Sequence, residues 1–167
     1  MRATAIALAG LGILALAIVG DAEGQMMGGQ GGGMMGGQDM ARMNPATRAR
    51  DRDFWRGGVA AAYRSARNPL SADAKTLATG RTVYRDNCAA CHGASGRGDG
   101  EAGQDLDPKP VDLTAMRYRN PRMAAPMFYA ISEGGEAYGS AMPAFKDGLS
   151  ESERWAVISY IQSGFAP

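Results

Sequence analysis

The chain has 167 residues, 24 of them glycine, and a formal net charge of +1. This length suits one ordinary domain with appended segments, and eleven of the glycines crowd into the region before residue 40, where their backbone entropy disfavours a packed core. The near-neutral charge argues against a nucleic-acid partner, because such a protein needs a dense basic face to displace counterions from phosphates. We therefore expect one globular unit later in the chain and no nucleic-acid binding.

A run of apolar and small residues occupies positions 3–20, directly after Met1 and Arg2. It fits two kinds of segment: a secretory signal cleaved after Ala22, or an anchor helix just long enough to span a bilayer. Residues 1–22 are therefore interpreted as a signal peptide or an N-terminal membrane anchor. Both interpretations predict a periplasmic or other extracytoplasmic protein, soluble or anchored.

Residues 23–43 form a linker rich in glycine, glutamine and methionine. Six methionines lie in it without a helical or strand period, and Met-Met-Gly-Gly occurs at both 26–29 and 34–37. Soft thioether sulfur binds Cu(I), so copper binding is one interpretation of this segment. We expect the simpler one, a flexible tether.

Residues 44–70 form a basic extension. Between 42 and 67 the chain carries seven arginines and two aspartates, whereas residues 71–167 have a net charge of −2. Phe54, Trp55 and Tyr63 are interspersed with these charges, which indicates a short helix docked on the domain or on a partner. As a solvated arm, the same stretch would steer association with an acidic partner.

The motif that carries chemistry is Cys-Ala-Ala-Cys-His at 88–92. In this spacing one helical turn brings both sulfurs to the two vinyl groups of one porphyrin, and the histidine reaches the iron. A redox disulfide would use the same cysteines, but usually in a βαβ setting that is absent here. Zinc would need further ligands, and the chain has only two cysteines and one histidine. We expect one haem c, covalently held through Cys88 and Cys91, with His92 on the iron.

Residues 71–167 resemble the class I (mitochondrial-type) cytochromes c, and specifically small bacterial mono-haem members. The stretch SADAKTLATGRTVYRDNCAACHG looks like the N-terminal helix of that family, opening at Ser71 as N-cap. The stretch LSESERWAVISYIQSGF, with Ser150 and Glu153 in capping-box spacing, resembles the C-terminal helix. The resemblance implies an all-α, small cytochrome c fold in which three to four helices wrap one covalent haem.

By the same resemblance, the two terminal helices cross closely. Gly80 would permit the approach, and Tyr84 would lie against Tyr160. A middle helix is expected over 121–133, with Met127, Phe128 and Ile131 lining the haem pocket.

The loop from Gly139 to Phe145 matches the axial-methionine loop of the family and implies Met142 as the sixth iron ligand. Eleven methionines compete for this role, but six lie in the linker. Met116, Met123 and Met127 fall in or near a predicted helix, whereas Met142 precedes a proline in a rigid loop. A haem with histidine and methionine ligands leaves no open site for a substrate.

The glycine-rich stretch 93–114 resembles the loop that follows the haem motif in the family. There a proline carbonyl accepts the histidine ring N–H, and we favour Pro110 over Pro108 for this role. Tyr138, together with Arg117 or Arg119, is a candidate for contacts with the haem propionates.

The expected function is single-electron transfer and not catalysis on a substrate. The chain would act as a carrier, or as a tethered subunit of a respiratory or photosynthetic electron-transfer chain, with redox proteins or a membrane oxidoreductase complex as partners. Residues 3–20 would provide the membrane tether. The alternative is a haem enzyme or gas sensor with an open sixth coordination site, which requires that Met142 is not a ligand.

Overall fold

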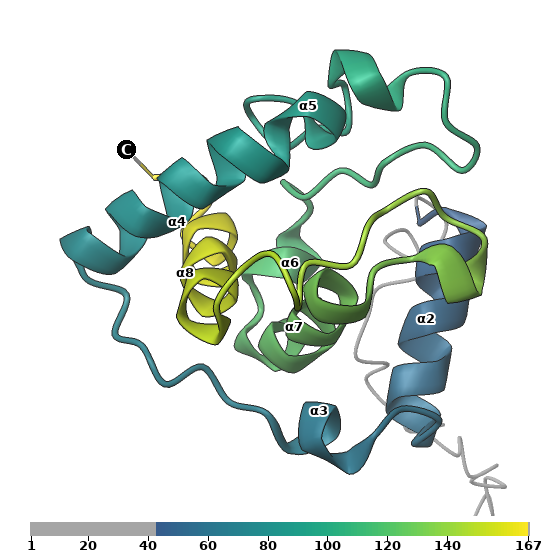
Figure 1. Cartoon of the computed structure of the whole chain (residues 1–167), viewed down its shortest axis with the longest axis horizontal. Coiled ribbons are helices and arrows are strands. Elements are labelled where there is room, and N and C mark those ends of the chain that lie inside the picture. The colour runs from purple at the N-terminus through teal and green to yellow at the C-terminus, as the bar shows by residue number, and fades with distance from the viewer. Residues whose placement is uncertain (1–42, 167) are drawn as a thin grey trace, which may run out of the picture. The chain divides into compact units, whose positions relative to one another are not determined.

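Helices make up all the regular structure of residues 43–166, the part of the chain that the computed structural model describes (Figure 1). The α-helices are α2 (Pro45–Arg56), α3 (Ala61–Ser65), α4 (Ala74–Asn87), α5 (Ala89–His92), α6 (Met116–Arg119), α7 (Ala124–Glu133) and α8 (Glu151–Gln162). Short 3-10 helices are η1 (Glu101–Gly103), η2 (Pro121–Met123) and η3 (Glu136–Tyr138). The absence of strands from 43–166 confirms the predicted all-α class.

The predicted apolar run 3–20 lies outside the described residues, and so does the predicted linker 23–43 except for its last residue, Met43, which is buried. Among the helices within 43–166, none combines the length and the apolar character needed to cross a membrane.

Helix α4 starts at an aspartate cap and ends at the haem motif. The Oδ1 atom of Asp73 accepts the Thr76 N–H at 2.8 Å, which satisfies one of the free amides of the first turn. The predicted start at Ser71 is wrong, because Asp73 is the residue whose carboxylate reaches this amide. At the other end the Cys88 N–H donates to the Tyr84 carbonyl at 2.9 Å, so the helix leads directly into the cysteine-containing turn.

Helix α8 forms the centre of the core. The capping box predicted at its start is confirmed: the Glu153 N–H donates to Ser150 Oγ at 3.2 Å, and the Ser150 N–H donates to Glu153 Oε2 at 2.9 Å. Every residue from 155 to 161 is buried. Figure 1 shows α8 surrounded by α4, α6 and α7.

Helices α4 and α8 cross in close contact at Gly80. A Cβ atom at this position would lie 2.1 Å from the Ala156 carbonyl oxygen and 2.8 Å from the Tyr160 Cβ. One turn later Tyr84 packs on Tyr160 with ring centroids 5.8 Å apart. The predicted close crossing is therefore confirmed.

The middle helix, predicted over 121–133, begins as η2 and continues as α7. Phe128 does not reach the cavity described below, so that part of the prediction is wrong. Its ring stacks on Trp155 of α8, with centroids 4.0 Å apart and planes 4° apart. The stack fixes α7 against α8 and turns Met127 and Ile131 toward the cavity.

The basic extension folds back on the same chain as α2 and α3. Asn44 caps α2 by accepting the Thr47 N–H at 2.8 Å, Pro45 occupies the first helical position, and Gly57 ends the helix in the left-handed region at φ 86°. Phe54 is buried at the contact with α7. The helix predicted in this stretch thus docks on its own domain.

Polar links fasten the extension in place. Arg117 of α6 pairs with Asp51 of α2, and the two side chains are only 4 % and 7 % exposed. Tyr138 donates a hydrogen bond to Asp53 at 2.7 Å. A buried ion pair contributes little net stability, but removing one partner leaves the other charge without compensation.

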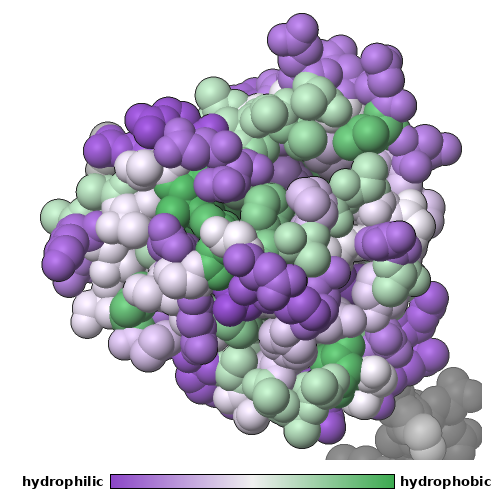
Figure 2. All heavy atoms as spheres, in the orientation of Figure 1, coloured by the Kyte–Doolittle hydropathy of each residue, from purple (hydrophilic) through white to green (hydrophobic). Residues whose placement is uncertain are grey.

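The described surface is mixed in character. Figure 2 shows that strongly hydrophobic residues appear on this face only as small, separate areas among hydrophilic ones. Trp55 and Met116 are the large apolar side chains that remain exposed within 43–166.

We predict that Gly80→Ala lowers the free energy of unfolding by about 2 kcal/mol, because the new methyl group overlaps the backbone of α8. The overlap outweighs the higher helix propensity of alanine, which alone would stabilise a helix interior by about 1 kcal/mol relative to glycine. Denaturant unfolding of the purified protein measures the loss of stability. Gly148→Ala is the control, since no atom lies within 4 Å of the added Cβ; equal stability of the two variants would contradict the prediction.

We predict that Asp51→Asn destabilises the protein by about 3 kcal/mol, because the buried Arg117 guanidinium then lacks a counter-charge. The measurement is thermal unfolding together with limited proteolysis of residues 44–70. Asp86→Asn removes the same carboxylate charge from the exposed pair with Arg85, where we expect no measurable change in stability because solvent screens the pair. A small effect of Asp51→Asn would show that the pair does not hold the extension.

Candidate functional site

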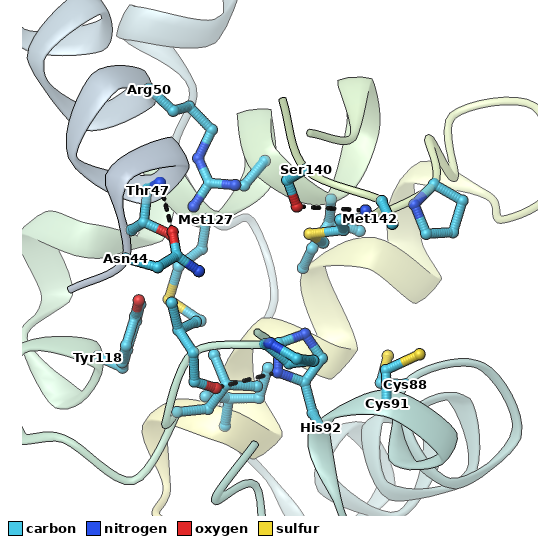
Figure 3. A pocket seen from close by; sticks show the side chains of 18 of the residues that line it. Asn44, Thr47, Arg50, Cys88, Cys91, His92, Tyr118, Met127, Ser140 and Met142 are labelled. Carbon is cyan, nitrogen blue, oxygen red and sulfur yellow. Dashed lines mark hydrogen bonds between the residues drawn. The ribbon is translucent and has the colours of Figure 1, made fainter. Parts of the chain in front are cut away.

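The Cys-x-x-Cys-His motif forms a single helical turn at the end of α4. Cys88 ends α4 and precedes α5, and its carbonyl accepts the N–H groups of Cys91 at 3.2 Å and His92 at 2.9 Å. Gly93 then reverses the chain at φ 79°, in the region that favours glycine. The turn brings both cysteines and the histidine to the wall of one cavity (Figure 3).

Both cysteines are half-buried free thiols. Burial raises the pKa of the Cys88 thiol to about 12, with a smaller contribution from Cys91. A catalytic dithiol needs the opposite shift, toward the thiolate, so the environment of Cys88 does not favour a redox disulfide. Within residues 43–166 no three His, Cys, Asp or Glu side chains cluster as a metal site.

His92 is held by its inner ring nitrogen. Nδ1 lies 3.2 Å from the carbonyl oxygen of Val111. A carbonyl can only accept, so Nδ1 carries the proton in this contact and Nε2 keeps its lone pair for a metal. Burial lowers the pKa of the His92 ring, which favours the neutral form that coordinates iron.

The predicted interaction with Pro110 is made by its neighbour. The Pro110 carbonyl faces Gly98, where an added Cβ would approach it to 2.5 Å. The carbonyl of the next residue, Val111, therefore points to the histidine ring. Pro110 and Pro108 line the same cavity with their side chains.

The cavity is large and mainly apolar. Counted with its open mouth, it contains about 1110 Å³ of space that no protein atom fills. Leu113, Ile131, Phe145 and Ile161 are among the side chains that line it. Such a wall suits a large flat hydrophobic group.

Met142 lies across the cavity from His92 (Figure 3). Its loop is fixed to the end of α7, because the Gly135 N–H donates to the Met142 carbonyl at 2.9 Å and the Phe145 N–H donates to the Ile131 carbonyl at 2.9 Å. The Met142 side chain is half-buried. The structure thus brings the predicted axial methionine to the same cavity as the predicted axial histidine.

Two further methionines, Met123 and Met127, also line the cavity. Met116 is 72 % exposed and does not line it. Both were excluded as iron ligands at the sequence level because they lie in or near a helix, although Met127 was expected in the pocket wall, and the structure brings both side chains to that wall.

The structure does not place the predicted propionate contacts in the cavity wall. The Tyr138 hydroxyl bonds to Asp53 and lies 3.1 Å from the Tyr129 hydroxyl, and burial raises its pKa. Arg117 is paired with Asp51, and Arg119 lies against Gly164. These three side chains are thus outside the residues that line the cavity.

The residues present fit a covalently held haem. Two thiols, a histidine with a free Nε2 and a methionine converge on an apolar cavity of adequate size. The remaining wall carries polar residues that the sequence did not predict, among them Asn44, Thr47, Arg50 and Tyr118. The Asn44–Pro45 pair is a readable helix start, but the sequence does not show which face of that helix turns to the cavity.

The chain matches the model of a known family. Residues 77–165, a little more than half of the chain, match the family model described as Cytochrome c. The matched range includes the Cys-x-x-Cys-His motif and the Met142 loop, and it excludes α2 and α3.

Two relatives extend over more of the chain. A cbb3-type cytochrome c oxidase subunit CcoP from Azospirillum brasilense is 28% identical over 106 residues, which cover 64% of this chain and 34% of the relative. The Kuenenia stuttgartiensis reducing HAO-like protein complex Kustc0457/Kustc0458 contains a chain that is 29% identical with a TM-score of 0.50, covering 59% of this chain and 47% of that one. The chain therefore spans about a third of the length of the first and about half of the second.

Proposed function

This chain belongs to the cytochrome c family, and we propose that it transfers single electrons through one haem c bound to Cys88 and Cys91. His92 is the first axial ligand of the proposal and Met142 the second. The observation that carries it is the convergence of these four side chains on one apolar cavity. When bound, haem c supplies a one-electron couple at its iron.

The protein residues have separate tasks in this function. The two cysteines keep the group attached through oxidation and reduction. The Val111 carbonyl holds the imidazole of His92 in one orientation and raises its basicity as a ligand. Met142 would be the second iron ligand, which would leave no coordination site for a substrate and would favour the reduced state.

The apolar wall of the cavity also affects the balance between the oxidised and reduced states. Side chains such as Ile131 and Ile161 line the cavity, and around a bound haem they would exclude water and lower the local dielectric constant. An environment of this kind needs little reorganisation when the charge of the site changes by one. That property suits transfer of an electron and not chemistry on a bound substrate.

The proposed setting is an extracytoplasmic electron-transfer chain. The names of the two relatives place them in multi-protein assemblies, one of them an oxidase subunit. We propose that this chain acts likewise as a carrier or a tethered subunit in a respiratory or photosynthetic chain, with redox proteins as partners. Export or anchoring would come from residues 1–22, a signal peptide or membrane anchor.

We predict that the ferric protein shows the weak long-wavelength absorption band of methionine sulfur on haem iron, and that Met142→Leu abolishes it. Met127→Leu and Met123→Leu are matched controls, because both methionines line the same cavity and each variant removes one sulfur atom. Optical spectra of the oxidised and reduced proteins measure the band. If the band disappears instead in one of the control variants, the methionine replaced in that variant is the iron ligand. A high-spin wild type that binds carbon monoxide would favour the enzyme or gas-sensor alternative.

We predict that haem stays on the wild-type chain through acid extraction and denaturing electrophoresis, because two thioether bonds hold it. Replacing both Cys88 and Cys91 by alanine should release all haem under the same treatment, since the chain has no other cysteine. Intact-protein mass before and after extraction measures the outcome. A wild type that loses its haem would contradict covalent attachment.

A further inference from the structure

Two polar groups in the cavity wall lack partners. Arg50 Nε and Tyr118 Oη are buried and form no hydrogen bond within residues 43–166. Both residues line the cavity, and Tyr118 is only 4 % exposed. Native proteins rarely leave buried polar groups unsatisfied, so these two atoms indicate a group that the cavity receives.

Two other buried nitrogens without a partner have a different setting. They belong to Arg117 and Arg154, whose guanidinium groups are already bonded through their terminal nitrogens to Asp51 and Ser132. Neither arginine lines the cavity. Arg50 and Tyr118 therefore stand apart, because they combine burial, lack of a partner and access to the cavity.

The charge of the wall is not balanced by the described residues. Within 43–166, Arg50 and Asp51 are the only side chains of fixed charge that line the cavity. Asp51 is engaged by Arg117, and Arg50 makes no ion pair with any described residue. A charge without a partner at a partly buried site costs desolvation free energy. The wall is therefore suited to bind an anionic group.

The position of this wall matches one edge of a haem. Figure 3 shows Asn44, Arg50 and Tyr118 on the side of the cavity away from Cys88 and Cys91. In haem c the ring edge that carries the two propionates lies opposite the edge that carries the thioether bonds. Asn44 also donates to the Lys109 carbonyl at 2.7 Å, which ties the start of α2 to the loop bearing the two prolines.

We propose that α2 and α6 form the propionate-binding wall of the haem site, with Arg50 as the charge partner and Tyr118 as a hydrogen-bond donor. This inference rests on the proposed haem function. Helix α2 lies outside residues 77–165, so the charge comes from the extension and not from the segment that matches the family model. Arg50 is a positioning and charge-setting residue with no contact to the iron.

A positive charge beside the haem favours the state with the extra electron. We expect Arg50→Gln to lower the midpoint potential by about 30 mV, which corresponds to a threefold change in the redox equilibrium at about 59 mV per tenfold for one electron. Arg50→Lys should restore most of the loss. Tyr118→Phe should shift the potential in the same direction by a smaller amount.

The matched control is Arg52→Gln. It removes the same charge from the same helix, but Arg52 is exposed and does not line the cavity. Potentiometric titration of each holoprotein gives the potential, and the propionate bending band in the resonance Raman spectrum reports the contact directly. The expected result is a shift of both readouts for Arg50→Gln and for neither in Arg52→Gln.

Three results would overturn the proposal: equal potentials for Arg50→Gln and Arg52→Gln, no recovery in Arg50→Lys, or a propionate band unchanged by Tyr118→Phe. The last variant removes only a hydroxyl group, so it keeps the test available where Arg50→Gln does not mature. Failure of the haem proposal itself would look different, because the wild type would then carry no covalent haem.

Discussion

The close packing of α4 on α8 at Gly80 determines where the functional groups lie. Only a residue without a side chain allows the two backbones to approach so closely, since a Cβ would fall 2.1 Å from a carbonyl oxygen of α8. Helix α4 leads into Cys88 without a loop, so its position sets that of both cysteines and the histidine. On the other side of α8, the stack of Trp155 on Phe128 positions α7 and the side chains that it turns to the cavity. Helix α8 thus positions two walls of the site, one through each of these contacts.

The third wall depends on the extension, which is fastened by contacts of a different kind. Apolar burial is small there, with Phe54 at its centre, and polar links such as the Asp51–Arg117 pair set the orientation of α2. A buried ion pair adds little net stability, but it fixes how α2 is positioned against α6, because any other position leaves a buried charge without its partner. This position decides that Arg50 faces the cavity, since the aspartate next to it faces α6.

The sequence predicted the parts of the site that depend on local spacing. Cys-x-x-Cys-His closes one helical turn, and Ser150 with Glu153 forms a capping box, because both patterns involve neighbouring residues. The N-cap of α4 is Asp73 and not the predicted Ser71. Ser71 and Asp73 are both good capping residues and lie two positions apart, so the sequence alone does not decide which of them caps the helix. The interaction of Val111 with His92 and the orientation of Arg50 were not predictable in the same way. Both depend on contacts between segments that are 19 or more residues apart in the sequence, and residue spacing does not predict such contacts.

Under the proposed assignment, the site separates attachment from adjustment of the potential. The cysteines, the histidine and the methionine all lie within residues 77–165, the range that matches the family. Arg50 lies outside it, on a helix that joins the core through its own contacts. A charge near the ring changes the redox equilibrium without touching the ligands, whereas any change at His92 or Met142 alters coordination itself. An appended helix can therefore adjust the potential while the haem-binding turn stays the same, and the extension becomes part of the redox site and not merely a tether.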